Sequence, residues 1–245
     1  PLLIDLEWLS DLGWLSNALV FENFSSISEF RSACLHDAFC GFRDAAPDLL
    51  MMAYKKFVAE HDDWLADFSL FTAISRSRKG TPWMSWEEPI RQRQESVLQT
   101  LQLTMADQIE QVKFEQFVFY TQWLEIKSYA NKQGILIVGD MPLFVAHDSV
   151  DVWANRSFFK VDRQGKAAVV AGVPPDYFSA TGQKWGNPVY DWLQLENDHF
   201  QWWIDRLRSQ LELYDLLRID HFRGLEACWE IPVEAVSAES GAWKN

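Results

Sequence analysis

The sequence is poor in the residues that hold metals and cross-links. Its 245 residues include three cysteines, Cys34, Cys40 and Cys228, whose odd number and spacing fit no zinc pattern. We expect these to be reduced core thiols in a cytosolic-type compartment. The five histidines form no H-x-x-x-H pair, which argues against a metal site.

The sequence also lacks long apolar runs and an excess of positive charge. No stretch of about 18 apolar residues occurs, so we expect no transmembrane helix. The formal net charge of -13 argues against nucleic acids and anionic membrane surfaces as partners. The first residues show no initiator Met and no signal-peptide pattern. We therefore expect Pro1 and Asn245 to be cuts inside a longer chain.

What the sequence does hold is aromatic side chains. It has 13 Trp and 17 Phe, and we expect most of them in the core. Their flat faces also suit the apolar faces of sugar rings. Trp83 and Trp86 lie on a Gly- and Pro-containing loop at 77–89. They are either a sugar platform or anchors tucked into the core, and we favour anchors.

Periodic apolar residues and glycine stops predict alternating helices and strands. Helical spacing predicts helices at 6–15, 25–42, 47–65, 67–75, 94–133 and 195–214. Gly134 ends the longest of these, and four branched apolar residues follow at 135–138, which predict a fully buried parallel strand. A helix, a short glycine turn and a buried strand in succession are typical of a β/α barrel or a doubly wound sheet.

The stretch from 147 to 192 shows little periodicity. It is rich in Gly, Pro, Asp and aromatic residues. A structureless stretch this long is uncommon in a compact domain, and its aromatic content argues against disorder. We predict an ordered excursion over an active-site face. With no internal repeat and no low-complexity linker, we predict one domain over 1–245.

A second buried strand is predicted at 216–220, LLRID, which combines three apolar residues with the charged Arg218 and Asp220. Arg218 and Asp220 are two apart, so on a strand they point to the same side. A carboxylate at a strand end, held ionised by a neighbouring guanidinium, is a nucleophile candidate. From spacing alone, a structural ion pair is an equally good interpretation.

Asp140 follows the strand predicted at 135–138, either as a functional carboxylate or as a cap on its own turn. Together with Asp220, it suggests a (β/α)8 enzyme whose strands deliver carboxylates to one edge. Glycan chemistry fits, since retaining glycosidases use a nucleophile and an acid/base roughly 5–5.5 Å apart.

Four motifs closely resemble segments of the amylomaltases, or 4-α-glucanotransferases, which form glycoside hydrolase family 77 within the α-amylase superfamily. The motif RIDHFRGLE at 218–226, with WEIP at 229–232, resembles the family's nucleophile segment. GDMPLFVAHDS at 139–149 resembles the segment after its third barrel strand, and PPDYFSATGQKWGNP at 174–188 resembles its acceptor-side loop. WLADF at 64–68 and FVFYTQW at 117–123 also fit, so the resemblance runs from end to end.

The resemblance implies a retaining transferase of α-1,4-glucan segments between maltooligosaccharides, needing no metal and no other cofactor. Asp220 would be the nucleophile and Arg218 would orient it. Asp140 would bind the donor sugar or support Asp220. The further substrate contacts implied by the family are Asp176, Tyr177, Gln183, Trp185 and Arg223. The family also implies a cytoplasmic enzyme, or one of the plastid stroma if the source is a plant.

The sequence departs from the family in one respect. The family's acid/base Glu and a further Asp lie on later strands, which would follow Asn245. Glu226 and Glu230 are present, but the family does not use them as acid/base. We therefore expect an incomplete (β/α)8 barrel with helical and loop insertions, which is inactive alone. A glucan hydrolase of the same superfamily and a non-catalytic glucan-binding protein remain open as alternatives.

Overall fold

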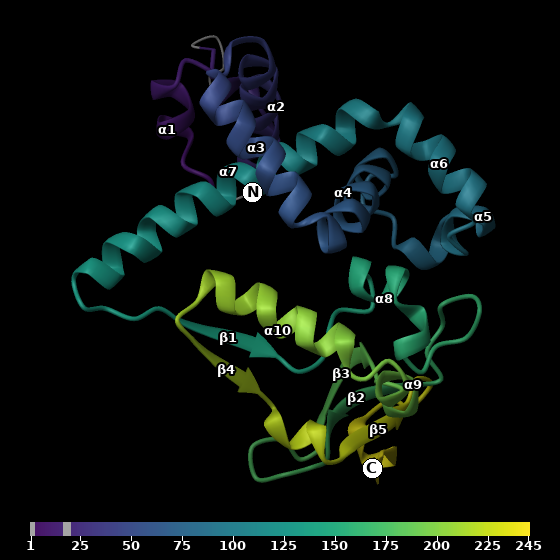
Figure 1. Cartoon of the computed structure of the whole chain (residues 1–245). Helices are drawn as coiled ribbons and strands as arrows, with labels where there is room; N and C mark the ends of the chain where they lie inside the picture. Colours follow the sequence, from purple (N-terminus) through teal and green to yellow (C-terminus); the bar gives the residue numbers. More distant parts are fainter. Residues whose placement is uncertain (1–2, 17–20) are drawn as a thin grey trace. The chain divides into compact units, whose positions relative to one another are not determined.

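The computed structural model describes residues 3–16 and 21–245, and its elements are mixed helix and strand (Figure 1). The helices are α1 (Leu6–Asp11), α2 (Ile27–Ala45), α3 (Asp48–Glu60), α4 (Asp62–Ser77), α5 (Glu88–Arg91), α6 (Glu95–Thr104), α7 (Ala106–Lys132), α8 (Val150–Ala154), α9 (Trp192–Asn197) and α10 (Gln201–Leu213). The strands are β1 (Val138–Pro142), β2 (Val169–Val173), β3 (Gln183–Pro188), β4 (Leu216–Asp220), β5 (Cys228–Pro232) and β6 (Ala242–Lys244). Within the described ranges, no helix combines the length and hydropathy needed to cross a bilayer.

The chain groups into two compact units. Unit 1 comprises Pro1–Ser77 and Thr100–Lys132, and unit 2 comprises Arg78–Gln99 and Gln133–Asn245. Our expectation of one domain over 1–245 stays a prediction.

Unit 1 is helical and holds an aromatic core. α2, α3 and α4 each pack against α7. The rings of Phe42 on α2 and Phe114 on α7 are 4.9 Å apart, and Trp14 and Tyr54 flank Phe42. Ser26 caps α2 by accepting a hydrogen bond from the Glu29 amide. Here the aromatic richness of the sequence serves the core.

Unit 2 contains a parallel strand pair. β1 and β4 pair in parallel with Asp140 opposite Arg218, and α10 packs beside both strands (Figure 1). Gly139 is required in β1 because a Cβ there would lie 2.4 Å from the Tyr214 ring. The predicted strand 216–220 is confirmed, whereas β1 begins at Val138 rather than Ile135.

The strands of this pair are more exposed than we predicted. Ile135 and Leu136 precede β1 and are each 59% exposed, and Leu216 at the start of β4 is 52% exposed. Parallel strands become buried when further strands and helices cover both faces. Among the described residues, β1 and β4 form a sheet of their own with no third strand. The prediction of fully buried strands is therefore wrong for this chain.

Unit 2 also holds a four-stranded antiparallel sheet in the order β3-β2-β5-β6. Val170 lies opposite Ile231 in the β2–β5 pair, and both join a small buried core with Ala167 and Ala238. Gly172 is required because a Cβ would lie 2.1 Å from the Gln183 carbonyl oxygen of β3. The segment 147–192 is ordered, as predicted, but β2, β3 and α8 give it regular structure that its sequence did not indicate.

The helix predicted at 195–214 is interrupted. His199 and Phe200 both adopt positive φ, at 54° and 57°, and separate α9 from α10. The break changes which side chains face inward. The helical spacing of apolar residues predicts one inward face with Phe200, Trp203, Ile204, Leu207 and Leu211. Trp203 is buried, but Phe200, Ile204 and Leu211 are exposed, so this prediction is partly wrong.

Candidate active site

The site residues on β1 and β4 are placed by the register of the two strands. Asp140 and Arg218 are direct partners across the pair, and Asp220 lies opposite Pro142 at the carboxyl end of β4. Alternate residues of a strand share a face, so Arg218 and Asp220 point the same way. Side chains 78 residues apart in sequence are thus brought together.

Arg218 bridges the two carboxylates. Its Nη1 donates to Asp140 Oδ2 at 2.5 Å, and its Nη2 donates to Asp220 Oδ1 at 2.6 Å. The three side chains remain 54–59% exposed, so the charges are still hydrated in this chain. The predicted pairing of Arg218 with Asp220 is confirmed, and Asp140 joins the same guanidinium rather than capping its own turn.

The chain after β1 is held by side chains from two later segments. Tyr190 is fully buried, and its hydroxyl donates to the Leu143 carbonyl at 2.7 Å. Arg206 of α10 donates to the same carbonyl at 2.8 Å and to the Pro142 carbonyl at 2.6 Å. These bonds satisfy backbone acceptors where the strand ends, and they fix the path of the segment beside the carboxylates.

His221 directly follows Asp220 and adopts the left-handed conformation, with φ 58°. Its ring makes an edge contact with Trp185 at 4.8 Å and lies 6.1 Å from Phe144. Burial lowers the pKa of His221; Asp220 opposes this shift and Arg223 adds to it. The neutral ring therefore packs as an aromatic group, and it links the end of β4 to Trp185 of β3.

Trp185 and Gln183 lie on β3. The Trp185 indole donates to Gln183 Oε1 at 2.9 Å, which orients both side chains. Trp185 is 38% exposed, so much of its ring remains accessible while its edge contacts His221. Both residues named from the sequence are thus connected, through His221, to the candidate nucleophile.

Asp176 and Tyr177 lie on the loop between β2 and β3. The Asp176 carboxylate accepts hydrogen bonds from the Phe178 and Ser179 amides at 2.9 and 2.8 Å, which forms a tight turn. This turn holds Tyr177 and Phe178 outward, 97% and 91% exposed. Among the described residues, no hydrogen bond or ring contact joins Asp176 or Tyr177 to the strand pair.

Arg223 follows β4 within a short 3-10 helix. Its guanidinium lies 4.3 Å from the ring centre of Trp243 on β6, a cation–π geometry. This contact ties the segment after the nucleophile to the edge of the antiparallel sheet. The structure places Arg223 on that ring and not in an ion pair with Asp220.

The two glutamates that follow the strand are poor acid/base candidates, as expected. Glu230 is on β5, has a side chain only 10% exposed, and pairs with Lys160 at 2.5 Å. Glu226 lies outside the strands, past the 3-10 helix. In the described part of the chain, no group of three His, Cys, Asp or Glu could hold a metal ion.

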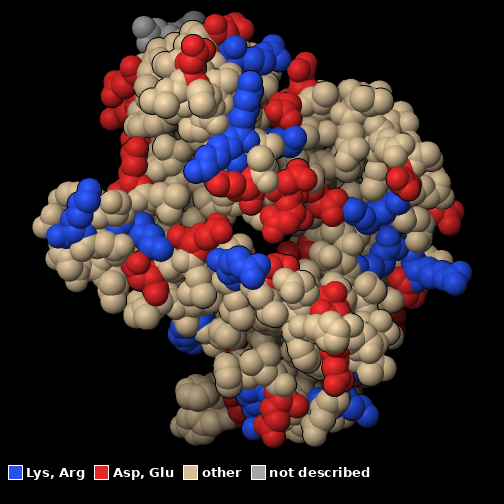
Figure 2. Space-filling model, viewed as in Figure 1, with Lys and Arg blue, Asp and Glu red and all other residues tan. Residues whose placement is uncertain are grey.

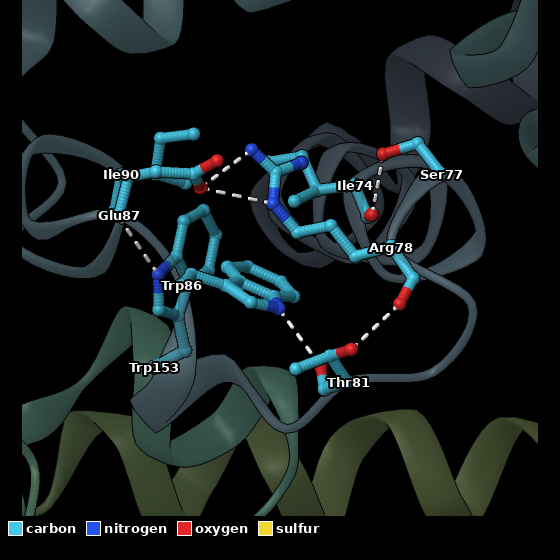
Figure 3. Close-up of polar contacts among 8 residues, drawn as sticks. All are labelled: Ile74, Ser77, Arg78, Thr81, Trp86, Glu87, Ile90 and Trp153. Carbon is cyan, nitrogen blue, oxygen red and sulfur yellow. Dashed lines mark hydrogen bonds and ion pairs between the residues drawn. The ribbon is translucent and has the colours of Figure 1, made fainter.

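The loop with the paired tryptophans belongs to the core. Trp83 is fully buried and Trp86 is 2% exposed. The Trp86 indole donates to the Thr81 carbonyl at 2.8 Å, and Arg78 pairs with Glu87 alongside it (Figure 3). The anchor interpretation is confirmed, and these two rings are not a sugar platform.

Sequence reasoning missed four residues that shape this site. Phe144 and His221 lay inside the recognised motifs, and their position beside candidate carboxylates was a usable signal. Tyr190 and Arg206 gave none, because Tyr190 sits in an aperiodic stretch and a single arginine in a helix does not indicate which backbone carbonyls it will meet. Their roles come from tertiary contacts with the backbone at 142–143.

Charge on the visible surface is mixed. Figure 2 shows Lys and Arg side chains interspersed with Asp and Glu on the face drawn. That face shows no continuous basic track of the kind that nucleic acids bind.

Comparisons with known proteins agree on one family. The sequence model of glycoside hydrolase family 77, described as 4-alpha-glucanotransferase, matches residues 1–245. The 4-alpha-glucanotransferases of Thermus thermophilus and of a Synechocystis strain are each 42% identical over 99% of this chain and 50% of their own length. The chloroplastic/amyloplastic rice enzyme is 47% identical over 74% of this chain and 30% of its own.

A solved structure matches as well. The amylomaltase from Streptococcus agalactiae, in complex with acarbose, superposes with a TM-score of 0.90 at 35% identity, covering 99% of this chain and 51% of that one. The chain therefore spans about half the length of the bacterial relatives it matches.

Proposed function

The chain belongs to glycoside hydrolase family 77, and from this membership we propose that it is the part of a 4-α-glucanotransferase that carries the nucleophile. The family resemblance is confirmed, and so is the fold class, an incomplete (β/α)8 barrel of the α-amylase superfamily with helical and loop insertions. The observation that carries the proposal is Arg218, which binds Asp140 and Asp220 with one guanidinium at a strand end.

The proposed reaction is a double displacement on an α-1,4-glucan. Asp220 Oδ attacks the anomeric carbon of the donor glucose as the bond to the leaving glucan oxygen breaks. That oxygen receives a proton from an acid/base carboxyl that these 245 residues do not supply. The 4-hydroxyl of an acceptor glucan then attacks the same carbon, gives its proton to the same carboxyl and frees Asp220.

Arg218 and Asp140 act on the nucleophile and the donor sugar. The guanidinium holds Asp220 in one orientation, which supports attack along a defined line. Asp140, held by the other arm of Arg218, offers a free oxygen to donor hydroxyls. Both side chains are more than half exposed, which leaves room for a ligand to reach them.

The remaining proposed contacts lie on β3, on the loop before it and in the 3-10 helix after β4. Trp185, oriented by Gln183, would stack on a sugar ring beside His221. Tyr177 is held outward by the Asp176 turn and would contact the acceptor chain. Arg223, seated on Trp243, would line the cleft past the nucleophile. By holding the acceptor and excluding water, these residues would favour transfer over hydrolysis.

The test uses a full-length protein that contains this chain. We expect Asp220→Asn to lower transfer from maltotriose on the order of 10⁴-fold or more, as loss of a nucleophile does in other covalent enzymes. Binding of acarbose should persist. Asp205→Asn is the matched control, because Asp205 is an acid on α10 paired with Arg208. A covalent glycosyl adduct mapped by peptide mass spectrometry to an acid other than Asp220 would overturn the assignment.

Product analysis separates the alternatives. Transfer from maltotriose yields glucose and a ladder of longer maltodextrins, whereas a hydrolase yields only shorter sugars. A non-catalytic glucan-binding protein would bind maltotriose and leave it unchanged. We further propose that residues 1–245 alone have negligible activity, and a product ladder made by that polypeptide would contradict this.

We also propose a reducing compartment, the cytoplasm or, in a plant, the plastid stroma. Cys34, Cys40 and Cys228 are free thiols, as such compartments allow. Fractionation of the source cells, with the protein found in a secreted fraction, would contradict this.

A further inference from the structure

Unit 1 contains a cleft that shares no lining residue with the proposed active site. It has a volume of about 690 Å³, which lies in the range of pockets for small ligands. α2, α4 and the α6–α7 junction line it, and its polar side chains include Ser28, Arg31, Ser32, Arg76, Gln108 and Glu115. All of these residues belong to unit 1.

Two of the lining residues, Arg76 and Glu115, form an ion pair with each other. Glu115 is 2% exposed, and both of its oxygens accept from Arg76, at 3.0 and 2.6 Å. Gln111 donates to Glu115 Oε1 at 3.0 Å. The carboxylate is therefore fully engaged and its charge is matched by Arg76. It has no capacity left to neutralise a second cation.

The second cationic side chain that lines the cleft is Arg31. Its Nη2 donates to the Ile4 carbonyl, and its Nε is buried with no hydrogen-bond partner. Among the described residues, no carboxylate forms an ion pair with Arg31. A guanidinium that is partly desolvated and unpaired with an acid is costly, so this side of the cleft favours an anion.

The groups beside Arg31 are hydroxyls and an amide. Ser28 and Ser32 are four apart on α2 and so share its face with Arg31. Both serines and Gln108 are exposed at the cleft. Hydroxyl and guanidinium donors together suit phosphate oxygens, and an amide that both donates and accepts suits sugar hydroxyls.

We propose that this cleft binds a hexose monophosphate, with the phosphate on Arg31, Ser28 and Ser32 and the sugar hydroxyls toward Gln108. The cleft is large enough for a hexose. Because Arg76 and Glu115 neutralise each other, Arg31 gives the lining a net positive charge. The site is separate from the proposed glucan site, so failure of either proposal leaves the other standing.

The test is isothermal titration of the 245-residue chain with glucose 1-phosphate, inorganic phosphate and glucose. We expect saturable binding of glucose 1-phosphate, weaker binding of phosphate and none of glucose. An excess of maltotriose should not displace the hexose phosphate, because the two occupy different units. Absence of binding, equal binding of glucose, equal binding of inorganic phosphate or displacement by maltotriose would each overturn the proposal.

Variants then locate the site. Arg31→Gln should weaken glucose 1-phosphate binding by about tenfold or more, the effect of losing a charge-assisted hydrogen bond. Gln108→Glu, at an exposed position that tolerates charge, should weaken it too by repelling the anion. Arg43→Gln is the matched control, since Arg43 is on α2 but pairs with Asp107 outside the lining. Unchanged affinity in Arg31→Gln and Gln108→Glu would refute the assignment.

Discussion

The two sheets of unit 2 are built from strands of similar length but are covered very differently. In the β1–β4 pair, Val138 and Leu216 are 60% and 52% exposed. In the antiparallel sheet, the partners Val170 and Ile231 are 2% and 0% exposed. The residues that carry the proposed chemistry therefore stand on the less supported sheet. The central strands β2 and β5 of the antiparallel sheet supply the buried core, and the more exposed strands paired with them, β3 and β6, carry Trp185 and Trp243.

The ion pairs of the two sheets differ in the same way. Lys160 pairs with Glu230 of β5, whose side chain is 10% exposed, whereas Arg218 and Asp220 of β4 are 59% and 54% exposed. Removing one member of an ion pair costs more when the other member is buried, because a desolvated charge is then left without a partner. The N–O distances of the two pairs are similar, so it is the exposure of the side chains that separates a structural pair from one that a substrate can reach.

The largest expected difference between the two sheets is in the free energy of unfolding lost when a core side chain is shortened. Ile231→Ala should lower the free energy of unfolding by about 3 kcal/mol, since it empties a fully buried site in the antiparallel sheet. Leu216→Ala, in the exposed pair, should cost less than about 1 kcal/mol. Urea unfolding followed by tryptophan fluorescence measures both. Equal costs would show that the strand pair is as well supported as the sheet.

The ion pairs give the next largest difference. Lys160→Met should cost roughly 1–2 kcal/mol, less than a fully buried pair because Lys160 is 41% exposed. Arg218→Met should cost under about 1 kcal/mol in the same urea experiment. In a full-length protein, however, Arg218→Met should lower transfer by about a hundredfold through misplacement of Asp220. A variant as active as the parent would remove the positioning role of Arg218.

The smallest effect concerns pH. Burial lowers the pKa of His221 in the folded chain below its ordinary value of about 6.5. The unfolded chain therefore binds this proton more readily, so the stability contributed by neutral His221 is complete above about pH 6.5 and declines as pH falls below it. His221→Asn, which tolerates the positive φ, should flatten the fall in stability between pH 7.5 and 5.5.

The control for this experiment is His199→Asn. His199 is also at positive φ, 54°, but is exposed. Its replacement controls for the loss of one histidine at a left-handed position, and His221→Asn should flatten the pH dependence of unfolding more than His199→Asn does. Curves for His221→Asn that run parallel to the parent's would contradict the buried-imidazole interpretation.

The sequence predicted helical structure over most of unit 1, and the strand 216–220, because their apolar residues repeat with a clear period. The break that it placed between 65 and 67 lies instead at His61, between α3 and α4. The helix predicted at 94–133 is α6 and α7, interrupted at Met105. β3 could not be predicted from its own residues: it contains Gly186 at φ 82° and ends at Pro188, and it is a strand because β2 pairs with it.

The candidate site was partly predictable for a similar reason. Arg218 and Asp220 share a face by simple alternation, so their contact follows from local geometry. The contact of Arg218 with Asp140 depends on how β1 and β4 pair, which cannot be read from either segment alone. The contacts of Arg206 with the backbone after β1 and the seating of Arg223 on Trp243 likewise depend on tertiary packing.

The ion pairs of Arg218 also favour one register of β4 against β1. A slip of β4 by one residue against β1 would turn Arg218 and Asp220 together to the opposite face, so Asp140 would lose its partner while Arg218 kept Asp220. The same guanidinium that presents the nucleophile therefore distinguishes the correct alignment of the two strands from its nearest misaligned neighbours.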